Sequence, residues 1–175
     1  PTITEPISPK SLQKVKGKIE FDHVWFAYQG EDWVLQDISF TVEPGQTFAL
    51  VGATGAGKTS VINLLNRLYD VQKGEIRIDG IPIKQIPLAE LRRSIGVVMQ
   101  DVFIFAGNIG ENISLGNENL TLADVKKAAE HVHANHFIER LPQGYDEPVA
   151  ERGATFSTGE RQLLAFARAL AYNPA

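Results

Sequence analysis

One eight-residue segment constrains this chain more than any other feature of its sequence. It fits the pattern G-x-x-x-x-G-K-(S/T) and reads Gly52, Ala53, Thr54, Gly55, Ala56, Gly57, Lys58, Thr59. Glycines let successive backbone N–H groups wrap around phosphate oxygens, because larger side chains would block the close approach. A helix that begins at Lys58 would add the positive end of its dipole. Lys58 could then reach the β- and γ-phosphates, and the Thr59 hydroxyl could ligate Mg²⁺, so we expect a phosphate-binding loop.

The neighbours of this loop favour the same interpretation. Residues 47–51 are nearly all apolar, as expected of a strand buried on both faces. Residues 58–69 carry apolar side chains at helical spacing. The loop alone leaves three classes open, because a transporter ATPase, a small-molecule kinase and a GTPase all use such a cradle.

Composition excludes several other classes. The chain has 175 residues, a formal net charge of −4 and no cysteine. A dedicated nucleic-acid binder needs clustered Lys and Arg, which this sequence lacks, and disulfide or thiolate chemistry needs cysteine. No apolar stretch reaches the roughly 20 residues that span a bilayer. We therefore expect one soluble cytoplasmic domain, with 43% apolar residues to build its core.

Hydrophobic patterning predicts the other elements. Antiparallel strands are expected over 18–26 and 34–42, and Asp79-Gly80 is a hairpin signal between strands at 75–78 and 81–83. A second buried strand is expected at 95–99, a loop at 112–119, and helices at 87–94, 121–132 and 158–172. Residues 107–143 look like an inserted helical subregion. Residues 1–17, with three prolines and no periodicity, are typical of a linker.

Beyond the loop, the span from Ile19 to Pro174 resembles the nucleotide-binding domain of ATP-binding cassette (ABC) transporters, most closely the exporter type. The resemblance is carried, besides the loop, by residues 19–28, 78–80, 95–105, 141–146 and 156–162. It implies an α/β P-loop NTPase fold with a mostly parallel core sheet, an antiparallel β-subdomain and an inserted α-helical subdomain.

The resemblance also implies roles for single residues. Tyr28 stands where the family places an aromatic ring under adenine; the less favoured alternative is a strand-end core tyrosine. Ser60 and the loop residues 52–59 would contact ATP, with Lys58 as the catalytic lysine. Gln100, with Thr59, would contact Mg²⁺, and the loop after Gln100 would face the membrane domain. Glu151-Arg152-Gly153 would lie near the coupling helices, or be a solvated turn.

Ser157, Thr158, Gly159 and Glu160 stand at the family signature, which usually reads Leu-Ser-Gly-Gly-Gln and caps the γ-phosphate bound by the opposite subunit. Here the segment departs from that pattern at Phe156, Thr158 and Glu160. A β-branched side chain and a carboxylate close to phosphate would weaken the site, since like charges 4 Å apart repel by about 4 kcal/mol at an effective dielectric of 20. We therefore expect a heterodimer with one weakened site, or else a homodimer that tolerates the changes.

In the family, a strand ending in Asp-Glu and a later histidine follow the last helix of this chain, and together they position Mg²⁺ and the attacking water. These lie beyond Ala175, so we expect the 175-residue chain to bind nucleotide without hydrolysing it. Residues 1–17 would be a linker from an upstream transmembrane domain, and residues 18–175 a nucleotide-binding domain lacking its C-terminal part. The complete protein would export a substrate at the cytoplasmic face of the cell membrane; the alternative is a soluble P-loop ATPase or kinase not coupled to transport.

Overall fold

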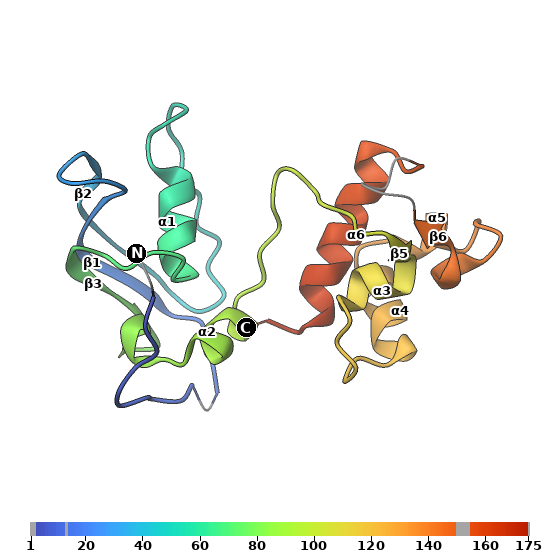
Figure 1. The fold of residues 1–175 in the computed structure, drawn as a ribbon, viewed down its shortest axis with the longest axis horizontal. Helices are drawn as coiled ribbons and strands as arrows, with labels where there is room; N and C mark the ends of the chain where they lie inside the picture. The colour runs from blue at the N-terminus through green and yellow to red at the C-terminus, as the bar shows by residue number, and fades with distance from the viewer. Residues whose placement is uncertain (1–2, 13, 150–154, 175) are drawn as a thin grey trace. The chain divides into compact units, whose positions relative to one another are not determined.

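A computed structural model of the chain describes residues 3–12, 14–149 and 155–174. They form two compact units, residues 3–95 and 96–174 (Figure 1). Within the described ranges, no helix combines the length and the apolar character that crossing a membrane requires.

The first unit is built on a four-stranded sheet. Its strands are β1 (Ile19–Ala27), β2 (Trp33–Val42), β3 (Lys73–Ile78) and β4 (Ile81–Pro82). Their order is β2-β1-β3-β4, and every neighbouring pair is antiparallel, which confirms the predicted strand pair and hairpin. Asp79 and Gly80 both adopt positive φ, 50° and 77°, as the tight two-residue turn between β3 and β4 requires.

Two helices and a short 3-10 turn complete this unit. They are α1 (Lys58–Leu65), η1 (Ile83–Gln85) and α2 (Leu88–Ser94). Val61 and Leu64 of α1 enter the core cluster that also holds the inward side chains of β1 and β3. The helix ends earlier than the predicted residue 69, because Arg67 takes the left-handed conformation with φ 49°, and Leu68 is left exposed.

The N-terminal segment, residues 3–12 and 14–16, lies along this unit as an extended chain without regular secondary structure. Arg67 Nη2 donates to the Thr4 carbonyl at 2.9 Å, and the Lys10 amide donates to the Gln85 carbonyl at 2.7 Å. Glu90 accepts from the backbone amide of Leu12, whose side chain is buried in the core. The segment is thus fastened to the unit mainly through its backbone.

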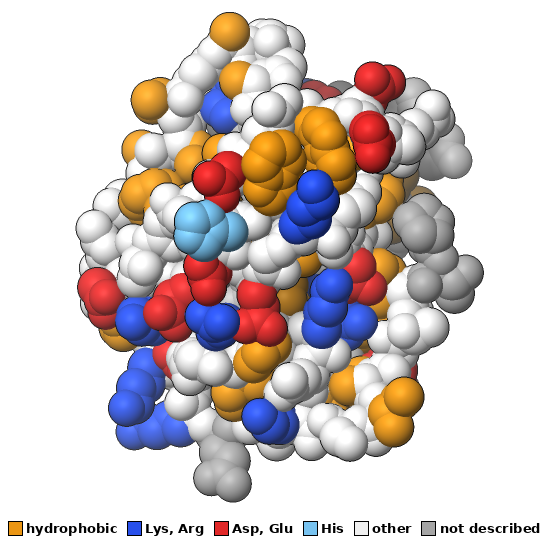
Figure 2. All heavy atoms as spheres, turned by 90° about the vertical axis from the view of Figure 1, so that its left-hand side faces the viewer, with side chains coloured by type: hydrophobic (Ala, Val, Ile, Leu, Met, Phe, Trp, Pro, Cys, Tyr) orange, Lys and Arg blue, Asp and Glu red, His pale blue; other side chains and the backbone are white. Residues whose placement is uncertain are grey.

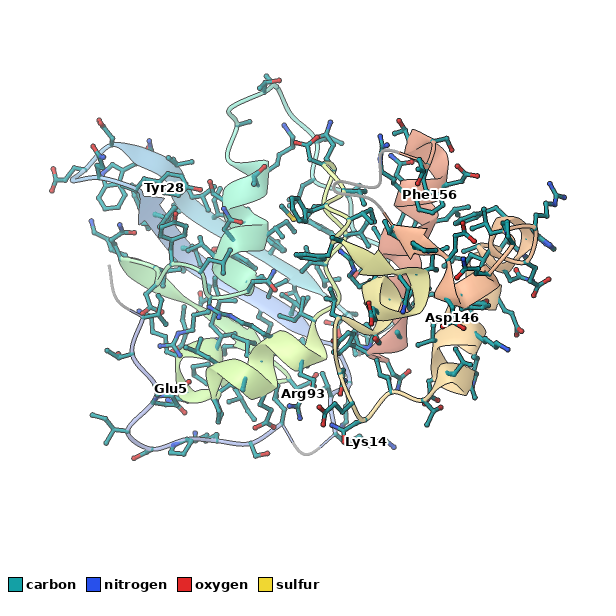
Figure 3. All side chains as sticks on the ribbon, turned by 45° about the vertical axis from the view of Figure 1, so that its right-hand side comes forward. Glu5, Lys14, Tyr28, Arg93, Asp146 and Phe156 are labelled. Atoms are coloured by element: carbon teal, nitrogen blue, oxygen red, sulfur yellow. The ribbon has the colours of Figure 1, made fainter. Side chains whose placement is uncertain are left out.

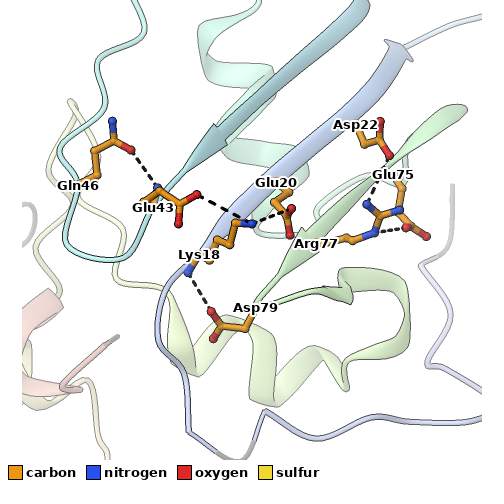
Figure 4. Close-up of polar contacts among 8 residues, drawn as sticks. All are labelled: Lys18, Glu20, Asp22, Glu43, Gln46, Glu75, Arg77 and Asp79. Atoms are coloured by element: carbon orange, nitrogen blue, oxygen red, sulfur yellow. Dashed lines mark hydrogen bonds and ion pairs between the residues drawn. The ribbon is translucent and has the colours of Figure 1, made fainter.

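Asp79 fastens the end of the same segment. Its carboxylate accepts from the backbone N–H groups of Lys16 at 2.7 Å, Gly17 at 3.4 Å and Lys18 at 2.9 Å, and Figure 4 shows the bond from Lys18. Partial burial raises the pKa of Asp79, but these bonds outweigh burial and hold the pKa below its usual value. The turn that joins β3 to β4 therefore also anchors the start of β1.

The outer face of the sheet is highly charged. Lys18 pairs with Glu20 at 3.1 Å, and Arg77 pairs with Glu75 at 2.6 Å and with Asp22 at 3.4 Å (Figure 4). Figure 2 shows acidic and basic side chains interleaved across the face of the molecule that it presents. Exposed pairs of this kind contribute little to stability, so the face is a solvated one.

The expected parallel strands are the main correction to the sequence prediction. Residues 47–51 and 95–99 form no strand in the structure, and all strand pairs among the described residues are antiparallel. Apolar side chains in both stretches are exposed, Val51 to 90% and Met99 to 62%. A parallel strand exists only through hydrogen bonds to neighbouring strands, and none of the described residues pairs with either stretch.

The second unit is mainly helical. Its elements are β5 (Gly107–Asn108), α3 (Ile109–Ser114), α4 (Leu122–His131), α5 (Asn135–Ile138), the 3-10 turn η2 (Gly144–Asp146), β6 (Pro148–Val149) and α6 (Thr158–Ala171). Helix α6 lies against both α3 and α4 (Figure 1), and their facing side chains form one apolar core. This confirms the predicted helical subregion.

Helix capping explains why one sequence prediction for this subregion is right and another is wrong. The predicted Thr121 and Asp124 capping box begins α4. The prediction of a loop at 112–119 is wrong at its start, because Asn108 and Glu111 form another capping box that begins α3. That helix ends where Leu115 adopts a positive φ of 48°.

Candidate functional site

The glycine-rich loop leads directly into α1. Gly57 is the N-cap of that helix and has a left-handed φ of 81°. A Cβ at this position would lie 2.7 Å from Leu35 Cδ2 and 3.2 Å from the Val34 carbonyl oxygen. Glycine is therefore required here both by backbone conformation and by space, because β2 lies directly behind the loop.

The first turn of α1 has the features of an anion site. Its N-cap makes no side-chain hydrogen bond, and the turn contains no acidic residue, so its amides are not capped by side chains. Residues 52–56 of the loop are exposed, as is Thr59. Uncapped amides and the positive end of the helix dipole together favour a negatively charged ligand.

Lys58 folds back over the loop. Its Nζ donates to the Gly52 carbonyl at 2.8 Å and to the Ala53 carbonyl at 2.7 Å. These bonds hold the ammonium group above the same backbone whose N–H groups would meet a phosphate. The structure thus brings together Lys58, Thr59 and the loop residues that the sequence singled out.

Tyr28 also belongs to this neighbourhood. It follows β1 (Figure 3), and its hydroxyl lies 3.0 Å from Ser60 Oγ in the first turn of α1. Its ring stands edge-on to Phe26 at 4.7 Å and to Tyr69 at 5.1 Å, while 46% of the residue is exposed. An aromatic surface is therefore available next to the loop, as stacking against a base would need.

Gln100 and the signature residues lie in the second unit. Gln100 is exposed in a bend after the stretch 95–99. Its amide oxygen and the Thr59 hydroxyl oxygen are the kind of hard donor that Mg²⁺ prefers, so each fits a magnesium ligand chemically. The segment Glu151-Arg152-Gly153 lies outside the described residues.

Ser157 begins α6 with a complete capping box. Its Oγ accepts from the Glu160 amide at 3.2 Å, and the Glu160 carboxylate accepts from the Ser157 amide and from Ser157 Oγ, both at 2.8 Å. Sequence reasoning treated Glu160 only as an added charge and missed this role. The spacing S-x-x-E was the signal that could have found it.

The other signature positions divide between core and surface. Phe156 is buried in the core of the second unit, and its ring lies 6.0 Å from that of Phe137 (Figure 3). Thr158 and Gly159 are exposed in the first turn of α6, and Thr158 Oγ1 accepts from Arg161 at 3.3 Å. The apolar change at Phe156 is therefore a packing change, whereas Thr158 alters the exposed helix end.

Arg168 is a residue whose role the sequence did not reveal. From α6 it donates to the Asn112 carbonyl at 2.8 Å and to the Phe103 carbonyl at 3.0 Å, and its guanidinium lies 5.4 Å from the centre of the Phe105 ring. Burial lowers the pKa of Arg168, although a guanidinium stays protonated at neutral pH. Through these contacts the signature helix holds the loop that follows Gln100.

Comparisons with known proteins agree with this geometry. A family model described as "ABC transporter" matches residues 35–175. The ABC transporter ATP-binding/permease protein YheH of Bacillus subtilis is 48% identical over 98% of this chain and 26% of its own length. The β-(1→2)glucan export ATP-binding/permease protein NdvA of Agrobacterium vitis is 48% identical over 95% of this chain and 28% of its own length.

A solved structure shares the fold as well. A bacterial Atm1-family ABC exporter with ATP bound has a TM-score of 0.92 to this chain and 40% sequence identity, and the match covers 98% of this chain and 30% of that one. The chain spans less than a third of the length of the curated relatives named above. Its loop, helices and signature segment, together with these likenesses, show that the chain belongs to the ABC transporter family.

Proposed function

We propose that this chain binds MgATP at the loop of residues 52–59 and serves as the ATP-binding domain of an exporter. The observation that carries the proposal is the start of α1, where left-handed Gly57 leads into an uncapped first turn beneath the Lys58 ammonium group. Backbone N–H groups would hold the phosphate oxygens, and Lys58 would neutralise the β- and γ-phosphates.

Thr59 and Gln100 would hold the metal ion. A bound Mg²⁺ would neutralise charge on the β- and γ-phosphates during transfer to water. Tyr28 would stack on adenine with its exposed ring, which is supported by its place beside the first turn of α1. In this way the chain's own residues would bind, orient and neutralise the nucleotide.

Titration of the complete protein with MgATP tests the phosphate site. Lys58→Ala should lower the affinity at least tenfold, because it removes the cation that faces the phosphates. Lys127→Ala is the matched control, since Lys127 is an exposed lysine of α4 and its loss changes the net charge equally. Equal affinities for Lys58→Ala and Lys127→Ala would remove the basis of the proposal.

The proposed partners are a transmembrane domain and a second nucleotide-binding domain, and the proposed location is the cytoplasmic face of the cell membrane. This proposal is supported by the relatives, which are named as ATP-binding/permease proteins and are more than three times as long as this chain. Residues 1–17 would lead from the membrane domain, and Thr4, Leu12 and Lys16 among them bond to Arg67, Glu90 and Asp79 of the first unit. About six apolar stretches of 20 residues in the sequence upstream would support this, and a soluble domain there would refute it.

For the second nucleotide-binding domain we propose a different chain rather than a second copy. Thr158 places a β-branched side chain at the exposed start of α6, where the family signature approaches the nucleotide of the opposite subunit. Such a signature would form a weak site, while the phosphate loop of this chain would work with the partner's signature.

Restoring the usual signature tests the heterodimer. Thr158→Gly with Glu160→Gln should raise ATP turnover at the signature site in the complete protein, and glutamine retains the capping box. Site-resolved ATPase rates that do not change would contradict the idea. A fully active assembly formed from copies of this chain alone would show a homodimer instead.

A further inference from the structure

The hydroxyl of Tyr28 forms a direct link between the end of β1 and the first turn of α1. It lies 3.0 Å from Ser60 Oγ, and Asn63 Nδ2 donates to it at 3.4 Å. Ser60 and Asn63 are neighbours on the helix surface because they are three residues apart. Two polar groups of α1 therefore meet the phenol oxygen of Tyr28.

The geometry of the link restricts the tyrosine ring. Ser60 is only 4% exposed, so its hydroxyl is turned inward, away from solvent. The ring packs nearly at right angles to Phe26, whose centroid is 4.7 Å away, and to Tyr69, whose centroid is 5.1 Å away. Because its oxygen is bonded and its ring is packed between neighbours, the side chain has lost most of its rotational freedom before any ligand arrives.

The same link connects Tyr28 to the phosphate loop. Ser60 is the second residue after Lys58, so the helical turn that bears the loop lysine also fixes the tyrosine. A ligand that contacts both parts would then find them at a preset separation, which lowers the entropy lost on binding.

We infer that Ser60, assisted by Asn63, is a positioning residue that holds the Tyr28 ring for base stacking. The inference rests on the proposed function, because it needs a nucleotide at the loop. In this role Ser60 acts through its bond to Tyr28, separately from its own expected contact with ATP. The Tyr28 hydroxyl makes no contact with the base and is needed only to fix the ring.

The test compares two ligands of the complete protein, MgATP and magnesium tripolyphosphate, which has the phosphate chain without a base. Tyr28→Phe keeps the ring and removes the link, and Ser60→Ala removes it from the other side. Each should weaken MgATP binding about three- to tenfold, the usual effect of one net hydrogen bond. In Tyr28→Phe the affinity for tripolyphosphate should stay unchanged, which also shows that this variant folds, and in Ser60→Ala it should fall less than the affinity for MgATP does.

Two further variants sharpen the result. In the double variant Tyr28→Phe with Ser60→Ala, the loss of MgATP affinity relative to tripolyphosphate should be no greater than in Tyr28→Phe, because that variant already removes the bond to Ser60. Tyr69→Phe is the matched control, since it removes a neighbouring phenol hydroxyl and leaves the ring contact with Tyr28 in place. It should bind MgATP like the wild type.

Each failure has a distinct meaning. Equal losses of MgATP and tripolyphosphate affinity in Ser60→Ala would show direct contact with phosphate and overturn the inference, and so would unchanged MgATP affinity in Tyr28→Phe. The proposed function fails by a different result, namely wild-type protein that binds tripolyphosphate no better than Lys58→Ala does.

Discussion

The substitution Asp79→Asn tests most directly how the N-terminal segment is attached to the first unit. One carboxylate oxygen accepts from Lys16 and Gly17, and the other accepts from Lys18. Asparagine tolerates the positive φ of this turn position, so the hairpin should persist. Its NH₂ group must, however, face one of the backbone donors in either orientation, which leaves that donor without an acceptor.

The size of the effect follows from the geometry. A hydrogen bond to a charged group contributes about 1.5–3 kcal/mol, and solvent screening at this half-buried site reduces the loss to about 1–2 kcal/mol. Local opening of residues 16–18 should therefore become about 5 to 30 times more frequent. Hydrogen–deuterium exchange of the complete protein should show correspondingly faster exchange at these amides, with α6 unchanged.

The pH dependence of the same variant checks the cause. Because the folded pKa of Asp79 is lowered, its contribution is fully present above the unfolded value of about 3.9 and is lost as the pH falls through the folded value. The difference between Asp79→Asn and wild type should be constant from pH 7 to 5 and shrink below about pH 4. Asp32→Asn, at an exposed acid in the turn before β2, is the control of equal charge. Exchange at residues 16–18 that responds equally to both variants would refute the reasoning.

Three further outcomes are expected. Gly57→Ala should lower the free energy of unfolding by more than the roughly 1–2 kcal/mol that an alanine in the left-handed conformation costs, because its Cβ has no room, and it should abolish tripolyphosphate binding. Gly55→Ala has open space around its Cβ and should lose less stability and less affinity for tripolyphosphate. The hydrogen bond that the His23 imidazole donates to the Asp37 carboxylate raises the pKa of His23, so the stability that the pair provides is present below about pH 6.5 and lost as the pH rises through the folded value; an NMR titration should show the raised pKa return toward normal in Asp37→Asn. Asn112→Ala should destabilise the second unit by about 2–4 kcal/mol, measured by denaturant unfolding, because Asn112 is 2% exposed and bonds both backbone groups of Phe105.

Local signals in the sequence predicted the elements that local rules determine. The Asp79-Gly80 turn, the Thr121 capping box and the start of α1 at Lys58 all lie where expected, because each depends on residues within a few positions of one another. The close approach of Tyr28 to the loop followed only from family resemblance. Its bond to Ser60 joins positions that are 32 residues apart in the sequence, and no local sequence pattern predicts such a contact.

The errors arose where structure depends on partners distant in sequence. The apolar runs at 47–51 and 95–99 have the composition of buried strands, but a strand forms only when another strand pairs with it. Arg168 could not be recognised because its acceptors, the carbonyls of Phe103 and Asn112, are backbone groups that every residue offers. Composition likewise described residues 1–17 as a linker and gave no sign of their attachment points.

The attachment of the N-terminal segment through its backbone has an evolutionary consequence. Thr4 is held by its backbone carbonyl group, and Lys10 and Lys16 by their backbone amides. Every residue has these groups, except that proline has no amide hydrogen. Apart from the buried Leu12, substitutions along the segment should therefore be tolerated among relatives, whereas Arg67 and Asp79, whose side chains bind it, should change rarely. In an alignment of the family, the path of the segment would thus be recorded mainly in the residues that it touches, and Leu12 would be the position of its own sequence that varies least.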